Sequence, residues 1–315
     1  MAEALANEMA QIGANRIFIM CSNTLSHHTP VIDDIKASLG KSFIDIFDEM
    51  PAHSPRSALL KAAAKAREAR PDLIVSVGGG SSIDGAKMIQ LMLAEDIRSH
   101  DDFDAFHLRR DAQGGLENPG FASGEIRQIA VPTTLSGAEF TTTAGSVDDK
   151  RHKKDLYIGP SLVPVSVILD PAVARHTHNN LWFSTAVRAI DHAVESIYSP
   201  KANPFTDANC MHGLKMMQVA LRATLKNPAD LEARLNKPDT RDRQALIAEL
   251  LGRPGGDAAD ALLELIRELG QPTTLREVGV QRDQLSQIAD TVIASGQASG
   301  NPRPVGHRND ILKIL

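Results

Sequence analysis

The chain has 315 residues, enough for two hydrophobic cores, so we expect two domains. Its 42% hydrophobic and 23% charged residues exclude a disordered or fibrous chain. The formal net charge is −5 and the basic residues are dispersed along the sequence, which excludes the basic stripe of a nucleic-acid-binding protein. We therefore expect a globular protein without a nucleic-acid partner.

The cysteines and the N-terminal residues indicate the compartment. Cys21 and Cys210 lie far apart without a Cys-x-x-Cys motif, which excludes a disulfide framework and a thiolate zinc site. Glu3 and Glu8 interrupt the first fourteen residues, which also lack the basic flank of a secretion signal. No apolar run approaches the ~20 residues that cross a bilayer. We expect a cytoplasmic protein with no membrane contact.

Short apolar runs alternate with helical patterns in the first half of the chain. Such runs, separated by helical crossovers, predict a parallel sheet that is covered on both faces. The predicted strands are 16–20, 42–47, 73–77, 129–131 and 165–169, and 58–69 is a typical helix between them.

The pattern changes after Asp170 and Pro171. The strand-like runs stop there, and amphipathic helices interrupted by prolines follow, which marks a domain boundary. We expect an α/β domain over residues 1–170 and an α-helical domain over residues 171–315. The charged, Pro- and Gly-rich stretch 226–260 fits either two short helices or a connecting segment.

A Gly-Gly-Gly-Ser loop at 78–81 joins the strand 73–77 to a helical pattern at 83–94. Glycines let a ligand approach the backbone, and with Ser81 as the N-cap, the amides and dipole of the first helical turn would bind pyrophosphate. The alternative is a tight turn that binds nothing, and the strict GxGxxG spacing is absent. Asp84 would either face a ribose hydroxyl or pair with Lys87 on the surface.

A hydroxyl-rich loop follows the strand 129–131, with six Ser or Thr residues between positions 133 and 143. Ligands of open α/β sheets gather at the carboxyl ends of the strands, where this loop should lie. Alternatively, the hydroxyls satisfy the backbone of their own loop. The residues alone leave both interpretations open.

A polar stripe runs beside the apolar positions of the predicted helix 184–199. Its members are Arg188, Asp191, His192 and Glu195. Such a stripe is either a solvated face or, if the helix borders a cleft, the lining of a site.

Four motifs, in this order and spacing, resemble those of the iron-type alcohol dehydrogenases and the related maleylacetate reductases. They are Gly-Gly-Gly-Ser-x-x-Asp-x-x-Lys at 78–87, Pro-Thr-Thr-Leu-Ser-Gly-Ala-Glu-Phe-Thr at 132–141, Leu-Asp-Pro at 169–171 and Arg-Ala-Ile-Asp-His-Ala-Val-Glu at 188–195. Segments 269–280 and 301–304 resemble the end of the same family. The resemblance implies a Rossmann-like nucleotide-binding domain followed by an α-helical domain, as in dehydroquinate synthase-like proteins, with NAD or NADP bound between them.

The resemblance also assigns cofactor contacts. Ser22 ends the first strand at a position where strictly NAD-specific members carry an acidic residue, so the choice between NAD and NADP stays open. The implied cofactor-binding residues are Ser22, Gly78, Gly79, Gly80, Ser81, Asp84, Thr133, Thr134, Ser136, Thr141 and Lys154.

Departures from the family pattern argue against a metal site. His192 matches a histidine that ligates the ion in metal-dependent members, but Arg188 replaces the aspartate four residues before it. After His212 the next histidine is His307, so the family's two downstream histidines have no counterpart. A segment near 235–243 is also missing relative to the family. We expect no bound iron or zinc, with His192 as a ligand only if a metal is present.

The resemblance implies hydride transfer between NAD(P) and an alcohol or carbonyl compound, with His192, Arg188 and Lys154 as the candidate catalytic residues. Arg188 would suit the carboxylate of a keto acid, because a guanidinium binds a carboxylate through two hydrogen bonds. Loss of the metal aspartate favours the metal-independent maleylacetate reductases, which convert maleylacetate to 3-oxoadipate. A degenerate, non-catalytic nucleotide-binding protein is the alternative of another class. The partners would be a small molecule and a second copy of the chain.

Overall fold

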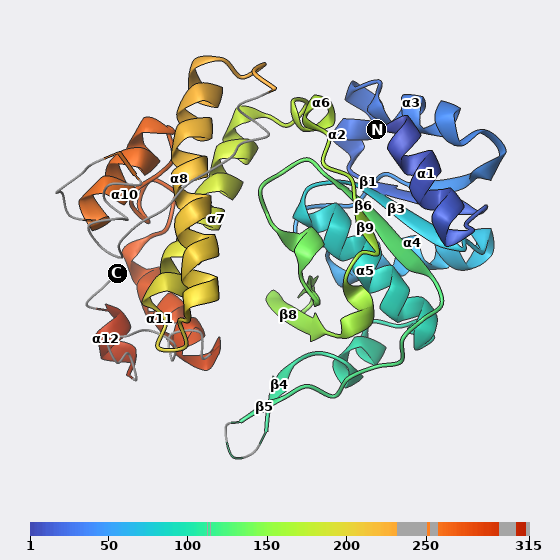
Figure 1. Cartoon of the computed structure of the whole chain (residues 1–315). Coiled ribbons are helices and arrows are strands. Elements are labelled where there is room, and N and C mark those ends of the chain that lie inside the picture. The colour runs from blue at the N-terminus through green and yellow to red at the C-terminus, as the bar shows by residue number, and fades with distance from the viewer. Residues whose placement is uncertain (112, 114, 232–250, 253–257, 296–306, 313–315) are drawn as a thin grey trace. The chain divides into compact units, whose positions relative to one another are not determined.

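The computed structural model describes residues 1–111, 113, 115–231, 251–252, 258–295 and 307–312. It divides into two compact units, Met1–Thr177 and His178–Leu315 (Figure 1). The first unit is built of helices and a parallel sheet, and every described long element of the second unit is a helix. The predicted fold class is therefore confirmed. The division falls at Thr177, a short distance beyond the boundary expected after Asp170.

The first unit is organised around a five-stranded parallel sheet with the order β2-β1-β3-β6-β9. Ile17 aligns with Leu73 and Leu73 with Arg127, so the central strands end at the same edge of the sheet. All five predicted strands are present, the last one shortened. Their bounds are β1 (Ile17–Cys21), β2 (Phe43–Phe47), β3 (Leu73–Gly78), β6 (Arg127–Pro132) and β9 (Ser166–Val167).

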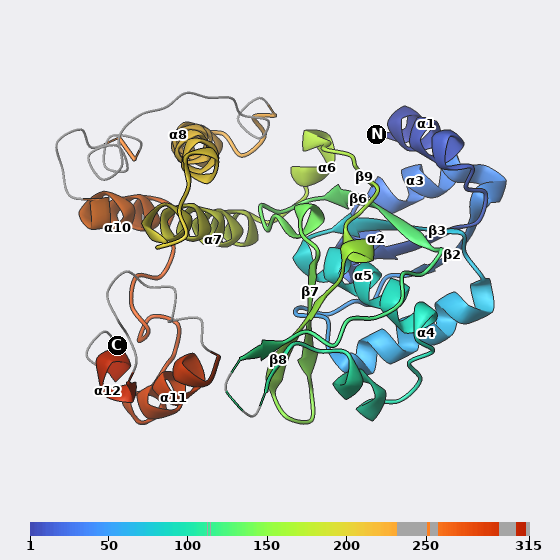
Figure 2. The same ribbon diagram turned by 60° about the horizontal axis from the view of Figure 1, so that its bottom comes forward.

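Both faces of this sheet are covered by helices (Figure 2). Because successive side chains of a strand point to opposite faces, Phe18 and Met20 join a core with α4 and α5, whereas Ile17 and Ile19 join a second core with α1 and α3. Burial of each such side chain contributes about 1.5–3 kcal/mol, which explains the continuous apolar runs. The helices are α1 (Ala2–Ile12), α3 (Val31–Leu39), α4 (Arg56–Ala69) and α5 (Gly80–Ala94).

Two antiparallel hairpins were not predicted. The larger pairs β7 (Thr143–Asp148) with β8 (Lys153–Ile158), and its Ala144 and Tyr157 are buried against α4 and α5. The small residues of β7 gave no apolar run, so its stability comes from this packing. The smaller hairpin pairs β4 (Arg109–Arg110) with β5 (Leu116–Glu117).

The Leu-Asp-Pro motif ends the first unit as a helix cap. The Asp170 side chain accepts a hydrogen bond of 2.9 Å from the Ala172 N–H, and Pro171 occupies the first helical position of α6 (Pro171–Ala174). Asp170 also lies 3.3 Å from the N-terminal amine. The remaining short elements of this unit are α2 (Asn23–His28) and the 3₁₀ turns Gly40–Ser42, Asp101–Ala105, Ala138–Phe140 and Pro160–Leu162.

In the second unit, α7 packs against α8, and Trp182, Ile190 and Leu214 are buried. The Asn203 side chain caps α8 by accepting a hydrogen bond from the Thr206 N–H. No helix in the described part of the chain is long and apolar enough to cross a membrane. The segment expected to be missing near 235–243 lies outside the described residues. The elements are α7 (Asn179–Tyr198), α8 (Pro204–Lys226), α10 (Ala258–Glu268), α11 (Leu285–Ser295), α12 (Arg308–Leu312) and the 3₁₀ turn Arg282–Gln284.

Candidate functional site

The glycine loop connects the end of β3 to the start of α5. Gly78 has φ +151°, which an L side chain rarely adopts, and a Cβ there would lie 2.5 Å from the Ser82 Oγ. A Cβ on Gly79 would lie 3.0 Å from the Thr134 Cγ2, and a Cβ on Gly80, the first residue of α5, would lie 3.2 Å from the Ser136 side chain. The hydroxyl-rich loop therefore lies directly against the glycine loop.

Ser81 is not the N-cap of α5, so that prediction was wrong. Gly79 is the N-cap and makes no side-chain cap bond. Ser81 is in the first turn, where its Oγ accepts the His53 N–H at 2.9 Å and its carbonyl accepts the Ser54 hydroxyl at 2.8 Å. In the described part of the chain, the N–H groups of Gly80 and Ser81 have no acceptor. The start of α5 therefore presents unpaired amides and the positive end of the helix dipole.

In the hydroxyl-rich loop, some hydroxyls bond the backbone of their own loop, and one is available for a ligand. The Thr141 hydroxyl lies 3.2 Å from the Ala138 and Thr143 carbonyls, and Ser136 accepts the Ala138 N–H, so these hydroxyls serve their own loop. Thr133 is buried, and its carbonyl accepts the Thr177 hydroxyl. The Thr134 Oγ1 is also buried, yet it has no hydrogen-bond partner among the described residues. A polar ligand atom beside Gly79 would satisfy it.

The β7–β8 hairpin brings Asp84 and Lys154 together. The Asp84 carboxylate accepts the Gly145 N–H at 3.1 Å. A Cβ on Gly145 would lie 2.9 Å from the Lys154 Nζ and 3.5 Å from the Asp84 Oδ2, so both charged groups lie beside Gly145. Burial raises the pKa of Asp84, while Lys87, the Gly145 amide and Lys154 lower it. Lys87 is fully buried, so the alternative of a surface pair with Asp84 was wrong.

Ser22 lies between β1 and α2, at the same edge of the sheet as the glycine loop, and is half-buried. The Asp48 carboxylate, directly after β2, accepts the Ser26 hydroxyl at 2.7 Å and lies 3.1 Å from the His27 Nε2. Asp48 was not predicted as a site residue, although a carboxylate that directly follows a strand was a usable signal.

The segment around His53 and Ser54 was not predicted either. Both residues have left-handed φ values, +64° and +47°, each of which costs about 1–3 kcal/mol in a non-glycine residue. The segment is held between Ser81 and β7, because the His53 carbonyl accepts the Val147 N–H and the Ser54 carbonyl accepts the Ser146 hydroxyl. Nothing local in the sequence indicated this conformation, since the partners are distant in the chain.

The polar stripe of the second unit lies on α7. The Arg188 Nη1 is 3.1 Å from the Asp191 Oδ2, and both side chains are exposed. His192 is exposed, and its carbonyl accepts the Ser196 hydroxyl at 2.7 Å. Residues three and four apart share one side of a helix, so Arg188, Asp191 and His192 are neighbours on α7.

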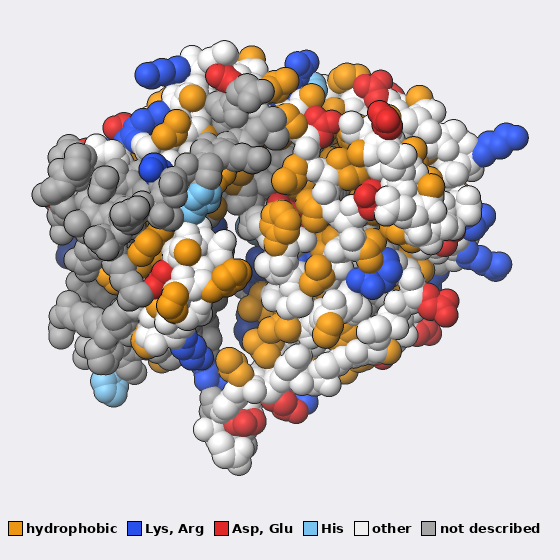
Figure 3. Space-filling model, viewed as in Figure 1, with side chains coloured by type: hydrophobic (Ala, Val, Ile, Leu, Met, Phe, Trp, Pro, Cys, Tyr) orange, Lys and Arg blue, Asp and Glu red, His pale blue; other side chains and the backbone are white. Residues whose placement is uncertain are grey.

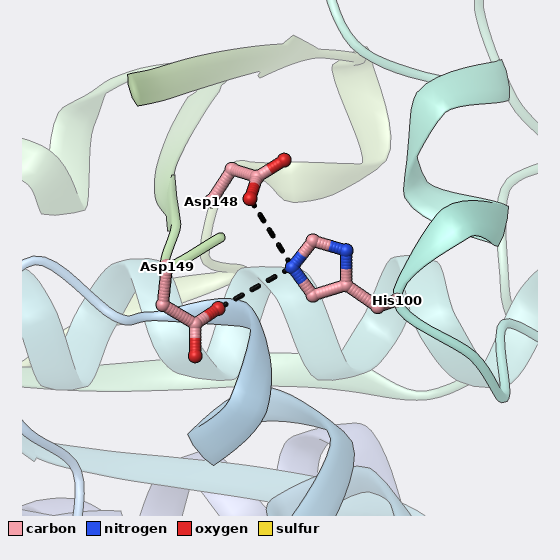
Figure 4. Close-up of side chains that lie close together, drawn as sticks. All are labelled: His100, Asp148 and Asp149. Atoms are coloured by element: carbon pink, nitrogen blue, oxygen red, sulfur yellow. Dashed lines mark ion pairs between the residues drawn. The ribbon is translucent and has the colours of Figure 1, made fainter. Parts of the chain in front are cut away.

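Among the residues that the structure describes, two groups of possible metal-ligating side chains are found, both in the first unit. In one, the His100 Nε2 is 3.2 Å from Asp148 and 3.4 Å from Asp149 (Figure 4). The second group is Asp104, His107 and Asp155. Arg56 is fully buried between the groups and forms ion pairs with carboxylates of both, and Arg151 adds a second guanidinium. We interpret the two groups as one ion-pair network rather than as metal sites.

Charges of both signs are interspersed over the visible face of the first unit (Figure 3). This distribution agrees with the dispersed charges of the sequence and provides no continuous basic surface on that face.

The sequence profile of the iron-containing alcohol dehydrogenase family matches residues 1–171. The profile of the C-terminal part of the Fe-containing alcohol dehydrogenase family matches residues 183–238 and 235–315. Both halves of the chain therefore match the same family.

Among curated relatives, the dehydrogenase FUM7 of Gibberella moniliformis is 30% identical over 277 residues, which cover 85% of this chain and 65% of that protein. The chain thus spans slightly less than two thirds of that relative. Maleylacetate reductase 1 of Cupriavidus pinatubonensis is 23% identical over 366 aligned positions, which cover 100% of this chain and 91% of the relative.

Solved structures share the fold. Maleylacetate reductase from Agrobacterium tumefaciens superposes with a TM-score of 0.76 at 22% identity, over 100% of this chain and 92% of that chain. Alcohol dehydrogenase from Oenococcus oeni superposes with a TM-score of 0.83 at 20% identity, over 99% and 94% of the two chains.

Proposed function

Because the chain belongs to the iron-containing alcohol dehydrogenase family, we propose that it is an oxidoreductase that transfers a hydride between NAD or NADP and a small alcohol or carbonyl compound. The observation that carries this proposal is the buried Thr134 hydroxyl beside Gly79, which has no partner in the described part of the chain, together with the unpaired amides of Gly80 and Ser81 that follow. A glycine loop with unpaired amides at a helix N-terminus suits a pyrophosphate.

The residues at this edge of the sheet fit a dinucleotide. We assign the pyrophosphate to the loop of Gly78, Gly79, Gly80 and Ser81, with the Thr134 hydroxyl donating to one of its oxygens. Asp84 would repel a phosphate, so we assign it, with Lys154, to a hydroxyl of the nicotinamide ribose. Thr133, Ser136 and Thr141 shape the opposite wall. At the adenosine end of the cofactor, Ser22 stands where strictly NAD-specific members carry an acidic residue. We therefore propose that either NAD or NADP can bind.

The nicotinamide ring, when bound, supplies or accepts the hydride. We propose that Arg188 binds a substrate carboxylate through two hydrogen bonds and that His192 delivers a proton to the oxygen that becomes the alcohol. Lys154 would keep the ribose hydroxyl oriented. These roles come from the resemblance and from the shared side of Arg188 and His192 on α7.

The residues of α7 do not fit the iron of the family's name. Arg188, paired with Asp191, precedes His192 by one turn, and a guanidinium cannot ligate a cation. Within the part of the second unit that the structure describes, no group of three metal-ligating side chains includes His192. The proposed roles of Arg188 and His192 therefore involve no metal.

Reduction of maleylacetate to 3-oxoadipate is the second candidate function. It is favoured by Arg188, which suits a dicarboxylate substrate, and by the relatives and structures of that name that align with the entire chain. A keto acid or an unsaturated keto acid would then replace the simple aldehyde as the substrate.

The experiment is a binding titration of the protein with NADH and NADPH, followed by assays of cofactor oxidation with aldehydes, 2-keto acids and maleylacetate, each with and without a chelator. We expect binding of at least one nucleotide and turnover that survives chelation. Binding without turnover of any substrate would support the degenerate nucleotide-binding protein instead. Absence of nucleotide binding would refute both.

A further inference from the structure

Lys87 is a buried cation in the middle of α5, with no exposed surface. Its Nζ donates to three carbonyl oxygens, those of Ala138 at 2.6 Å, Thr141 at 2.8 Å and Thr143 at 2.8 Å. It also lies 3.1 Å from the Thr141 Oγ1. An ammonium has three N–H donors, and all of these acceptors belong to one segment, the turn 138–143.

This turn ends the hydroxyl-rich loop and leads into β7. The N–H groups of Phe140 and Thr141 donate to the carbonyls of Gly137 and Ala138, and the Thr142 carbonyl accepts the Gly159 N–H. None of these bonds reaches α5, whereas the Lys87 ammonium joins the turn to that helix. The same helix begins at the glycine loop, against which the Thr134 and Ser136 side chains are packed. One helix thus carries the phosphate-binding amides at its start and, two turns later, the cation that holds the opposite wall.

The charges around Lys87 come from three elements. Asp84 lies one turn earlier on α5, Glu139 is buried in the turn itself, and Lys154 projects from β8 beside Asp84. Burial lowers the pKa of Lys87 from 10.5 to about 8, while Asp84 and Glu139 act in the opposite direction. A neutral amine has only two N–H donors, so deprotonation removes one of the three carbonyl bonds.

We propose that Lys87 is a positioning residue of the cofactor site, whose ammonium fixes the turn 138–143 to α5 and so holds the Thr134 and Ser136 side chains against the glycine loop. This inference rests on the proposed function, because it explains how that site keeps its shape. Lys87 itself touches no substrate or cofactor.

Two consequences separate positioning from a general role in stability. Nucleotide affinity falls as the pH rises through about 8, because Lys87 then loses its proton. The contribution of Lys87 to stability changes in the opposite direction. Between pH 8 and 10.5, Lys87 is protonated in the unfolded chain and largely unprotonated in the folded chain. The free energy of unfolding therefore increases with pH over this window. A loss of affinity over this window is therefore not caused by unfolding through this group.

The experiment measures the dissociation constant of ADP-ribose for the parent, Lys87→Met, Lys87→Arg and Lys65→Met between about pH 7 and about pH 10, together with urea unfolding. Lys65 on α4 is the matched control. Its Nζ also donates to a backbone carbonyl, that of Ile46 in β2 at 2.6 Å, but this bond lies away from the glycine loop and the turn 138–143. We expect about tenfold weaker binding for Lys87→Met at neutral pH, partial recovery for Lys87→Arg, and no alkaline loss in either, whereas Lys65→Met follows the parent.

The outcomes are distinguishable. If the parent binds ADP-ribose and Lys87→Met binds it equally well, the positioning role is wrong and the proposed function stands. If the Lys87 variants do not fold, the pH dependence of the parent and of Lys65→Met tests the inference. A dissociation constant for ADP-ribose that stays constant up to about pH 10 in both proteins overturns it. If the parent binds no ADP-ribose at any pH, the proposed function falls and this inference falls with it.

Discussion

At the scale of single residues, the contact between Gly79 and Thr134 defines the shape of the site. Gly79 has φ −80°, which any residue adopts, so a side chain here would be crowded by the neighbouring threonine and not strained by the backbone. Both residues were singled out in the sequence, but only through a repeated glycine and a run of hydroxyls. Their proximity depends on the alignment of β3 with β6.

Gly79→Val is expected to raise the nucleotide dissociation constant by about a hundredfold or more. The valine side chain would displace Thr134 and fill the space beside the α5 amides. Calorimetric titration with NADH and NADPH measures the loss. Gly213→Ala is the control, since a Cβ there meets nothing within 4 Å. Unchanged affinity in the Gly79 variant would show that the glycine loop is not the phosphate site.

Thr134→Val should change stability and affinity in opposite directions. The buried Oγ1 has no partner among the described residues, so its removal should stabilise the nucleotide-free protein by about 1 kcal/mol. The same change should weaken nucleotide binding by about tenfold, because the hydroxyl is proposed to bond the pyrophosphate. Urea unfolding and calorimetry test the two signs, and a loss of stability without a loss of affinity would contradict the assignment.

At the scale of elements, the β7–β8 hairpin decides where Lys154 and the Asp84 partner Gly145 lie. The hairpin is held to α4 by Arg56, which lies 2.9 Å from Asp155 and 3.4 Å from Asp148, both buried. Arg56 also lies over the Phe103 ring at 5.0 Å from its centroid. Neither Arg56 nor the hairpin was singled out in the sequence, because an ion pair between residues about a hundred positions apart leaves no local pattern.

Arg56→Met should destabilise the protein by about 3–5 kcal/mol at neutral pH, since it removes the buried cation of Asp148 and Asp155 and leaves the half-exposed Arg151 as their remaining guanidinium. Burial opposes ionisation of Asp148, but hydrogen bonds from Arg151 and Lys150 and the Arg56 charge hold its pKa far below the ordinary value. A depressed carboxylate pKa stabilises the fold above the unfolded pKa, and this contribution is lost as the pH falls. Urea unfolding should therefore show a smaller difference between variant and parent near pH 3 than at about pH 7. Lys150→Met, which removes an exposed cation of the same turn, is the control.

At the scale of the whole molecule, the chain combines an α/β unit that carries the proposed cofactor site with a helical unit that carries Arg188 and His192. The family match over both units supports the proposal that they act together in one reaction. We propose that Arg188, at a position where metal-dependent members carry a ligand, changes the substrate class as well as removing that ligand.

Arg188→Lys should raise KM for keto acids by about tenfold and leave KM for simple aldehydes unchanged, because lysine keeps the charge but loses the two-pronged geometry. His192→Ala should instead lower kcat, by about a hundredfold, if its imidazole protonates the product oxygen. Steady-state kinetics with both substrate classes measure these effects. If both variants match the parent on every substrate, the stripe on α7 is only a solvated surface.

The parallel sheet, the order of α/β and helical parts, and the two loops of the candidate site could be predicted from the amino-acid sequence, since apolar periodicity and glycine spacing are local properties. Four features could not: Ser81 is not a cap, Lys87 is buried, Thr134 lies against Gly79 without a partner among the described residues, and a hairpin brings Lys154 to Asp84. These features depend on partners far apart in the chain. Their energies come from burial, hydrogen bonds and ion pairs that exist only once the sheet and its helices have packed.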